Sequence, residues 1–482
     1  MTDLRFPRVA ALKTADALRR HLTTNGITLE FDDTLTSPES SPLAAPLTVE
    51  GFTIGNRFSI LPMEGWDGTT DGLPSELTTR RWKHFGSSGA KLIWGGEAVA
   101  ICHEGRANPN QLVLEDRTER SIAGLRDVLV SEHRDRFGPG AADDLYIGLQ
   151  LTHSGRFARP VQGTPAPLTA YAHPQLDARF PGGLHVLTDD ELDRIALGFV
   201  RAAKMARDIG YHFVDFKHCH GYLLHELLGA KTRGGKYGGS LDNRTRMLRD
   251  VIDGIRAEAP GLAIAVRISV FDVVPHRKGA AGRGEPEVAS NDYPVGFGVI
   301  DTEEAAMDTA LSESRQVLAM LRERGIRLIC TTAGSPYYCP HVQRPAAFPP
   351  IDGYQPPEDP LRGVARQIDA TARLKAAFPD LVFVGSAYSY LQEWLPNVAQ
   401  YNVRNGLTDF VGLGRMTLSS PDLPADVLAG APLKRKAICR TFSDCTTGPR
   451  MGLVSGCYPL DPFYLRHPDA SRLKEIKAGL SE

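Results

Sequence analysis

Eight short apolar runs, separated by longer amphipathic stretches, are the feature that most restricts the fold of this 482-residue chain. The runs are rich in β-branched and other apolar residues, as is typical of strands that are buried on both faces. Strands of this kind that alternate with helices form parallel sheets, and eight such units indicate a closed barrel rather than an open sheet. The sequence therefore predicts an α/β fold, the (β/α)8 TIM barrel. The runs are residues 58–63, 91–100, 145–153, 212–218, 263–269, 327–334, 381–387 and 409–415.

Two of the stretches between the runs carry clear helix signals. Residues 187–210 begin with Thr188 and Glu191 at the spacing of a capping box, and Gly210 follows the last turn as a stop. Residues 240–260 place five apolar side chains on one helical stripe. We expect both helices to cover the outside of the barrel. The stripe is Met247, Leu248, Val251, Ile252 and Ile255.

The pattern also suggests how the chain is divided. We expect an N-terminal extension over residues 1–45, the barrel over 46–430, and a cysteine-containing C-terminal tail packed on the barrel over 431–482. Long connections follow the fifth and sixth runs, at 271–301 and 335–360, and are rich in Pro, Gly and aromatic residues. This composition favours ordered lids over the barrel mouth rather than helices.

Composition restricts the partners. Lys plus Arg (55) nearly equals Asp plus Glu (57), so no basic field indicates nucleic acid. No run reaches the roughly 18 apolar residues of a membrane span, and the N-terminus lacks a signal-peptide core. Seven scattered cysteines indicate thiols that stay reduced. We therefore expect a cytoplasmic protein that binds a small molecule and no membrane, and the sequence leaves a homo-oligomer open.

Reactive side chains gather where the apolar runs end, which is where a TIM barrel holds its active site. The fourth run ends in Lys217 and His218, and His220 and Tyr222 follow it directly. Alternation along a strand puts Asp215 and Lys217 on one face, so Lys217 is expected to point into the barrel mouth. A lysine there is also compatible with a flavin-free Schiff-base lyase or with a non-catalytic ligand carrier. His218, Cys219 and His220 could suggest metal ligands, but adjacent residues on a strand point in opposite directions and the usual zinc spacings are absent, so no metal site is expected.

Turns after the last two runs suggest a phosphate site. Barrel proteins often bind phosphate at this position through backbone N–H groups and an arginine. Glycines that only make tight turns are the simpler interpretation of each turn taken alone. Two such turns, at neighbouring strand ends and with an arginine, favour phosphate binding. The residues concerned are Gly385, Ser386, Gly414 and Arg415.

Nine short motifs, taken in their order and spacing, resemble the Old Yellow Enzyme family of NADH:flavin oxidoreductases. The resemblance implies FMN as cofactor and NADH or NADPH as electron donor. It also implies an enzyme that reduces an activated C=C bond, with oxidation or demethylation of an amine as the alternative. The motifs are NRFSILPM (56–63), GLPSEL (72–77), GGEAVAICHEGR (95–106), QLTHSGR (150–156), HGYLLHELL (220–228), YGGSLDNRTR (237–246), VRIS (266–269), VGSAYS (384–389) and VGLGRM (411–416).

The resemblance also assigns roles to individual residues. Gln150 and Arg267 match positions that meet the pyrimidine end of the flavin, where an amide supplies donor and acceptor and a cation stabilises negative charge. Pro62, Met63 and Ala98 match positions that line the flavin. In the family, two side chains anchor the substrate carbonyl and a tyrosine protonates the substrate. The matching residues here are Lys217, His220 and Tyr222.

Two residues depart from the family pattern. Lys217 stands where the first anchoring histidine is usual, and its ammonium brings a full charge and three donors, which favours a polar or anionic substrate. Glu64 stands where a small Cys or Thr is usual, and its carboxylate can pair with Lys217 or with a substrate cation. Glu64 also supports the amine alternative. We expect substrate contacts from Glu64, Trp66, His218 and Tyr337.

The tail resembles the cluster-binding region of the 2,4-dienoyl-CoA reductase and trimethylamine dehydrogenase branch of the family. Cys439, Cys445 and Cys457 correspond to cluster ligands. A four-iron cluster takes four thiolates, and Thr441 or Phe442 occupies the place where the fourth is expected. We therefore expect no iron–sulfur cluster.

Overall fold

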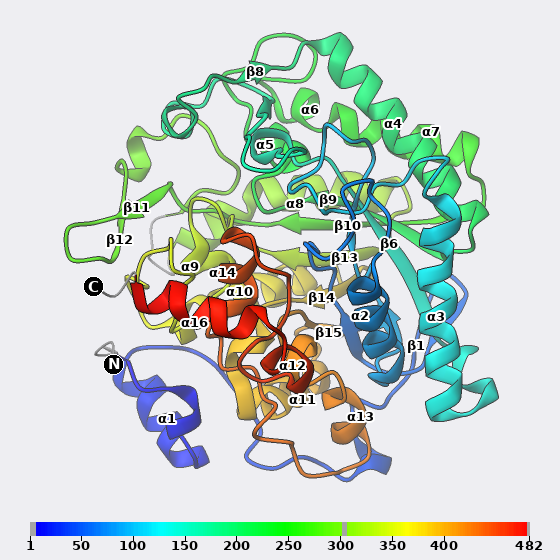
Figure 1. The fold of residues 1–482 in the computed structure, drawn as a ribbon, viewed down its shortest axis with the longest axis vertical. Coiled ribbons are helices and arrows are strands. Elements are labelled where there is room, and N and C mark those ends of the chain that lie inside the picture. Colours follow the sequence, from blue (N-terminus) through cyan, green and yellow to red (C-terminus); the bar gives the residue numbers. More distant parts are fainter. Residues whose placement is uncertain (1–5, 301–305, 480–482) are drawn as a thin grey trace.

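A closed barrel of eight parallel strands forms the centre of the computed structural model, which describes residues 6–300 and 306–479 (Figure 1). The predicted fold is confirmed, because each apolar run contributes a strand. The barrel closes where β15 pairs with β3, and β4 pairs directly with β6. The strands are β3 (Phe58–Ile60), β4 (Leu92–Ile93), β6 (Tyr146–Thr152), β9 (Phe213–His218), β10 (Ala263–Ser269), β13 (Leu328–Thr332), β14 (Val382–Gly385) and β15 (Phe410–Leu413).

The second apolar run divides into two strands. After β4 the chain passes Gly95 and Gly96 and then forms β5 (Ala98–Ala100), which pairs alongside β6. A Cβ atom on Gly95 would lie 2.7 Å from the backbone nitrogen of Gln150, so only glycine allows this close approach. The extra strand therefore comes from a local bend inside one predicted run.

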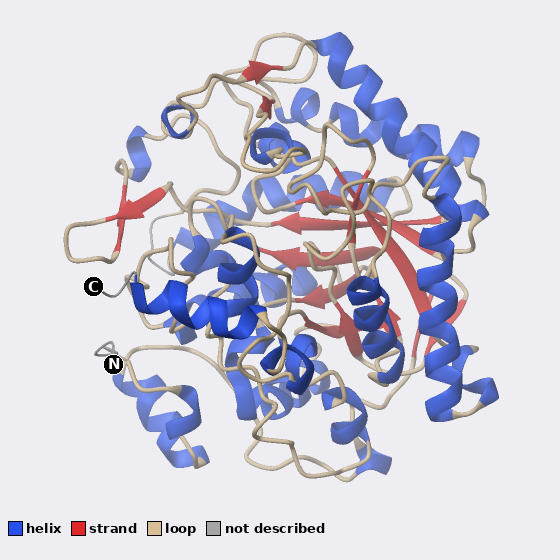
Figure 2. Cartoon of the chain, in the orientation of Figure 1, coloured by secondary structure: helices blue, strands red, loops and turns tan. Residues whose placement is uncertain are grey.

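Helices surround the barrel, as Figure 2 shows with blue helices around red strands. Helix α4 (Asp189–Asp208) has the predicted capping box at Thr188 and Glu191. The second predicted helix is interrupted at Thr245, whose φ of −99° and ψ of 0° separate α6 (Leu241–Arg244) from α7 (Arg246–Glu258). The predicted apolar stripe lies on α7 and is buried as expected. Other long helices are α2 (Glu76–Ser87), α3 (Glu119–Phe137), α8 (Met307–Glu323), α10 (Pro360–Ala377) and α11 (Leu395–Arg404).

Side chains of β9 alternate as predicted. Val214 and Phe216 join the large apolar cluster between strands and helices. Asp215 and Lys217 are buried on the other face, inside the barrel. The strand therefore delivers Lys217 to the open end of the barrel.

The long connections are mostly irregular. Residues 271–300 contain the antiparallel hairpin of β11 (His276–Lys278) and β12 (Gly284–Pro286). Residues 335–360 contain the short helix α9 (Pro340–Gln343), so the prediction of a lid without helix is wrong over these four residues. Short elements elsewhere are β1 (Leu47–Val49), β2 (Phe52–Ile54), β7 (Leu168–Thr169), β8 (His185–Val186), α5 (Leu223–Leu228), α12 (Met416–Ser419) and α13 (Leu423–Leu428).

Both terminal segments pack on the barrel. The N-terminal segment contains α1 (Ala15–Thr24), and the C-terminal segment contains α14 (Asp444–Arg450), α15 (Pro462–Leu465) and α16 (Asp469–Gly479). In Figure 1 the red helices α14 and α16 lie in front of the strands, close to α9. The boundaries at residues 45 and 430 remain a proposal.

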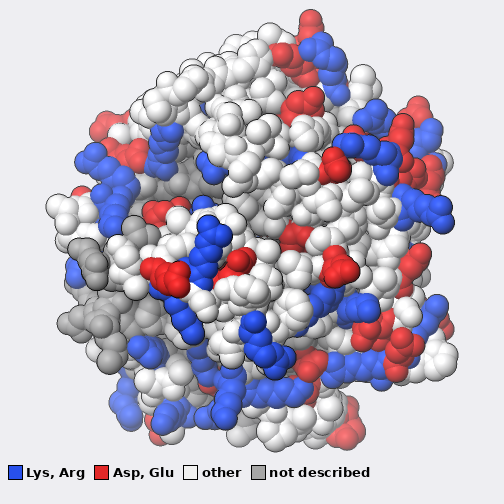
Figure 3. All heavy atoms as spheres, in the orientation of Figure 1, with Lys and Arg blue, Asp and Glu red and all other residues white. Residues whose placement is uncertain are grey.

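Charged side chains of both signs are interspersed over the face of the molecule drawn in Figure 3. Within residues 6–300 and 306–479, none of the helices combines the length and apolar character that a membrane crossing requires.

Candidate active site

A cavity of about 280 Å³ opens at the carboxyl ends of the barrel strands. Its walls come from the loop after β3, from the strand ends, from the connection after β13 and from the C-terminal tail. The structure therefore brings together most of the residues that the sequence singles out. Those that line the cavity are Pro62, Met63, Glu64, Trp66, Lys217, His220, Arg267, Tyr337, Ser386, Gly414 and Arg415.

The other predicted residues stand behind this lining. The Ala98 backbone donates to the Met63 carbonyl oxygen at 3.3 Å and so supports the cavity wall. His218 is still within β9 and its Nδ1 lies 3.2 Å from the Phe216 oxygen, so it is turned away from the cavity. Gly385 is the last residue of β14. Gln150 hydrogen-bonds to Asp215, and Tyr222 hydrogen-bonds to the cavity residues Glu64 and Tyr337.

Tyr222 belongs to a cluster of ionisable groups beside the cavity. Its hydroxyl donates to Glu64 Oε2 and lies 2.9 Å from the Tyr337 hydroxyl. Lys217 Nζ lies 3.5 Å from Glu64 Oε2 and 3.8 Å from the centre of the Tyr222 ring. Tyr337 in turn stacks on Phe157 with ring centres 3.9 Å apart. The tyrosine hydroxyl is thus held between a carboxylate and a second hydroxyl, while an ammonium group lies over its ring.

The cluster shifts the acidity of its members. Burial, together with the charge of Glu64, raises the pKa of Tyr222 well above its usual value. Burial lowers the pKa of Lys217, while the Glu64 carboxylate opposes this change. Tyr222 therefore keeps its proton over the whole physiological pH range.

A turn directly after β9 places His220 and Tyr222. His220 has a φ of 67° and Gly221 a φ of 79°, so two left-handed residues end the strand. A Cβ atom on Gly221 would lie 2.8 Å from Ser335 Oγ, which excludes any larger residue. The His220 carbonyl accepts from Ser335 Oγ at 2.8 Å, and its Nε2 lies 3.1 Å from Gln343 Nε2. Burial lowers the pKa of His220 well below its usual value, so the imidazole is neutral.

Asp215 organises the floor of the site. Its Oδ2 accepts from Trp94 Nε1 at 2.7 Å and from Gln150 Nε2 at 2.5 Å. Its Oδ1 accepts from the Arg267 backbone at 2.6 Å. Burial raises the pKa of Asp215 to about 6, although these donors oppose the shift. One carboxyl group therefore fixes both residues predicted to meet the pyrimidine end of the flavin.

The cavity offers donors that lack protein acceptors. Arg267 Nε and Arg415 Nη1 are buried and have no hydrogen-bond partner within the part of the chain that the structure describes. A Cβ atom on Gly414 would meet nothing within 4 Å, so this turn borders open space. Unsatisfied cationic donors are costly unless a ligand supplies oxygen atoms. The residues present therefore fit the carbonyl and phosphate oxygens of FMN.

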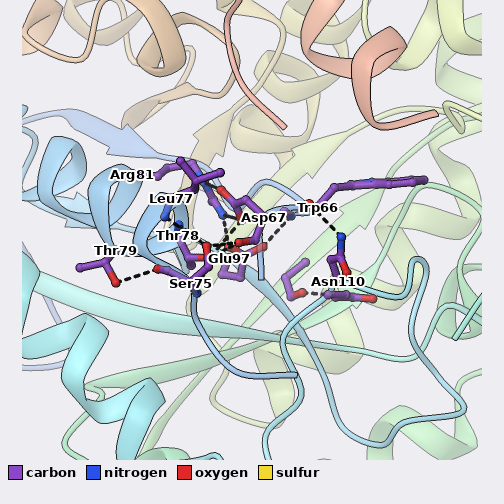
Figure 4. Close-up of polar contacts among 12 residues, drawn as sticks. Trp66, Asp67, Ser75, Leu77, Thr78, Thr79, Arg81, Glu97 and Asn110 are labelled. Atoms are coloured by element: carbon purple, nitrogen blue, oxygen red, sulfur yellow. Dashed lines mark hydrogen bonds and ion pairs between the residues drawn. The ribbon is translucent and has the colours of Figure 1, made fainter. Parts of the chain in front are cut away.

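A second ionic cluster fixes the loop that carries Glu64 and Trp66, and of its members only Glu97 lies in a sequence motif. Arg81 donates to Asp67 Oδ1 at 2.7 Å and to Glu97 Oε2 at 2.5 Å, and Glu97 Oε1 accepts from the Gly65 backbone at 2.6 Å. Figure 4 shows Asp67, Arg81 and Glu97 gathered together, while the Trp66 side chain extends away from them. Burial raises the pKa of Glu97, and the Arg81 charge opposes that shift. The cluster acts on the site by holding this loop in place.

The three tail cysteines lie in different surroundings. Cys445 and Cys457 line the cavity, whereas Cys439 is buried in the main apolar cluster, and all seven cysteines are free thiols. Phe442 packs against Phe348 with ring centres 5.3 Å apart. Across residues 6–300 and 306–479, no group of three or more His, Cys, Asp or Glu side chains is placed to hold a metal ion.

Sequence comparison relates the chain to flavin enzymes. Residues 42–307 match the model of the NADH:flavin oxidoreductase / NADH oxidase family. The NADH:flavin oxidoreductase FG08077 of Gibberella zeae is 27% identical over 48% of this chain and 58% of its own length. An NADPH dehydrogenase of Geobacillus sp. strain WCH70 is 28% identical over 79% of this chain and 92% of its own length.

Solved structures share the fold. The chain is similar to 2-naphthoyl-CoA reductase, with a TM-score of 0.63 and 17% identity, over 90% of this chain and 58% of that one. Histamine dehydrogenase from Rhizobium sp. 4-9 is similar with a TM-score of 0.61 and 21% identity, over 88% of this chain and 52% of that one. The old yellow enzyme homologue from Zymomonas mobilis is similar with a TM-score of 0.56 and 22% identity, over 82% of this chain and 94% of that one. The chain thus spans little more than half the length of several relatives, including the first two of these structures and the Gibberella protein.

The family model covers more than half of the 482 residues, including β3, β4, β6, β9 and β10. The match confirms the predicted resemblance, and it confirms FMN as the expected cofactor. The chain belongs to the NADH:flavin oxidoreductase / NADH oxidase family.

Proposed function

We propose that the chain is an FMN-dependent oxidoreductase that uses NADH or NADPH to reduce an activated C=C bond of a small polar or anionic substrate. The observation that carries this proposal is the Tyr222 ring against Lys217, with its hydroxyl bonded to Glu64, next to a cavity whose lining fits FMN. When bound, the flavin supplies the hydride. The family match argues against the flavin-free lyase alternative.

The protein side chains supply binding and the proton. Lys217 and His220 line the cavity and bind the substrate oxygen, which the ammonium group polarises. Tyr222 keeps its proton at physiological pH and donates it to the substrate carbon as a general acid. Glu64, Trp66 and Tyr337 line the same cavity and contact the substrate.

Residues at the strand ends form the side of the cavity that we assign to the cofactor. Arg267 places its guanidinium at the cavity, where Nη1 donates to the Pro62 oxygen at 3.3 Å and Nε is left for a ligand oxygen. The residues assigned to FMN are Pro62, Met63, Ala98, Gln150, Arg267, Gly385, Ser386, Gly414 and Arg415. Cytoplasmic location, the absence of nucleic-acid partners and the oligomeric state remain predictions.

Oxidation of an amine is the second candidate, and Glu64 favours it. Glu64 Oε1 is buried, borders the cavity and has no hydrogen-bond partner among the described residues. A substrate ammonium placed there would gain a carboxylate partner. One structural neighbour, histamine dehydrogenase, carries an amine substrate in its name.

Anaerobic rapid mixing tests both candidates. We expect NADH or NADPH to bleach the flavin absorption of the FMN-loaded protein, and an enone or enoate to restore it. Bleaching by a methylated amine without a nicotinamide would instead establish the second candidate. A protein that responds to neither class of compound would contradict the proposed function.

Replacing Glu64 by Gln tests the ionisable cluster. The carboxylate raises the pKa of Tyr222 and pairs with Lys217, so its loss lowers the tyrosine pKa and frees the ammonium charge. We expect the alkaline limb of substrate reduction to move to lower pH and a small carboxylate ligand to bind roughly 3–10-fold more tightly. The matched control is Glu30→Gln, at an exposed position. An unchanged pH profile together with unchanged carboxylate affinity would contradict the role of Glu64.

A further inference from the structure

Three arginines from separate parts of the chain line one cavity. Arg344 follows α9 in the connection after β13, Arg415 follows β15, and Arg450 ends α14 in the tail. All three lie outside the region 42–307 that the family model matches. Two of them, Arg344 and Arg450, were not anticipated from the sequence.

Arg344 is a half-buried cation without a carboxylate partner in the described part of the chain. Its Nη1 donates to Thr446 Oγ1 at 2.5 Å, and its Nη2 is buried with no hydrogen-bond partner there. Burial lowers the pKa of Arg344 to about 9, and the charges of Arg450 and Arg415 add to this shift. A guanidinium in this setting lacks the anion that normally compensates its loss of hydration.

The side chain of Arg415 reaches the backbone next to Arg344. Its Nη2 donates to the carbonyl oxygen of Pro345, the residue after Arg344, at 2.9 Å. Its Nη1 is buried and unpartnered within residues 6–300 and 306–479. Two neighbouring guanidinium groups thus each keep a donor free beside the turn at Gly414.

Arg450 brings the third charge from the tail. It lies one helical turn after Thr446, the residue that accepts from Arg344, and its side chain is 23% exposed. Its Nη1 donates to Asp352 Oδ1 at 2.6 Å. Arg450 is therefore partly neutralised by Asp352.

We propose that Arg344 and Arg450 join Arg415 in binding the phosphate group of FMN, so that the tail completes the phosphate site. This inference rests on the proposed function. A phosphate monoester carries up to two negative charges and accepts several charge-assisted hydrogen bonds, as the free donors of Arg344 and Arg415 require. The tail then contributes to phosphate binding without a metal, because Thr446 orients Arg344 and Arg450 adds positive charge.

Riboflavin, which lacks the phosphate, provides the test. Apo-protein is titrated with FMN and with riboflavin, and flavin fluorescence reports the dissociation constants. For Arg344→Ala we expect FMN binding to weaken roughly 10- to 100-fold, the cost of losing charge-assisted hydrogen bonds, with riboflavin binding unchanged. Arg450→Ala is expected to show a smaller loss of the same kind. Arg435→Ala, at an exposed position in the same tail and outside the cavity lining, is the control and should match the wild type.

The comparison separates the possible failures. If Arg344→Ala weakens FMN and riboflavin equally, or weakens neither, the inference is wrong. Arg344→Lys keeps the charge and is expected to retain part of the preference for FMN, which distinguishes lost charge from lost folding. A wild-type protein that binds neither flavin would refute the proposed function itself, whereas a variant that keeps the full FMN preference would refute only the phosphate assignment.

Discussion

Replacement of Tyr222 by Phe is expected to slow the reoxidation of the reduced flavin by an alkene substrate roughly 10²–10⁴-fold, the usual contribution of a general acid. The substitution removes the hydroxyl group to which the proposed function assigns the proton. It keeps the ring that packs 3.8 Å from Lys217 Nζ, so substrate binding should survive. Reduction by the nicotinamide should stay nearly unchanged. Rapid-mixing absorption measurements record the two half-reactions separately.

Tyr337→Phe is the matched control for this prediction. It removes the neighbouring hydroxyl, 2.9 Å away, and keeps the stack on Phe157. We expect a much smaller effect on reoxidation than in Tyr222→Phe. A large loss of the reoxidation rate in Tyr337→Phe, with normal reoxidation in Tyr222→Phe, would show that Tyr337 and not Tyr222 donates the proton.

Replacement of Asp215 by Ala is expected to lower the free energy of unfolding by about 3–5 kcal/mol, because several buried donors lose their acceptor at once. Trp94 Nε1, Gln150 Nε2 and the Arg267 backbone all donate to this carboxyl group. FMN binding should weaken as well, since Gln150 and Arg267 lose the group that positions them. Urea unfolding of the apo-protein measures the first effect, and flavin titration measures the second.

Asp190→Ala, at an exposed position at the start of α4, removes a carboxylate without these bonds and should change stability by less than about 0.5 kcal/mol. Equal stabilities of the two variants would contradict the role of Asp215.

The stability of the apo-protein should also depend on the protonation of Asp215. Burial raises its pKa from the ordinary 3.8 to about 6, so the folded state binds this proton more tightly than the unfolded state does. The resulting stabilisation is fully present below the unfolded pKa and is lost as the pH rises through the folded value. This part of the pH dependence should be absent from Asp215→Ala, and its persistence there would show that other groups cause it.

The regular parts of the fold could be predicted because each strand and helix has a local pattern. The run at 381–387 became β14, and the capping box at Thr188 became the start of α4. The break between β4 and β5 could not be predicted in this way, because it depends on contact between Gly95 and Gln150 across the sheet. Local pattern determines which segments are regular, whereas contacts between segments determine where they bend.

The same distinction between local pattern and contacts between segments applies to the site. Lys217, His220 and Tyr222 could be identified because they gather at the end of one strand and match the family pattern, and alternation within β9 fixes the direction of Lys217. The contact of Tyr222 with Glu64 joins residues 158 positions apart, and only the closed barrel brings them together. Arg344 and Arg450 lie in an irregular connection and in the tail, where no periodic pattern indicates direction.

Identification of the bound flavin tests the central claim most directly. The purified protein is denatured by heat, the precipitate is removed, and the released chromophore is identified by chromatography against FMN, FAD and riboflavin. The account predicts a visible flavin absorption band before denaturation and the release of FMN afterwards, without covalent attachment. A colourless protein that also fails to take up added FMN, or a flavin that stays with the precipitate, would contradict it.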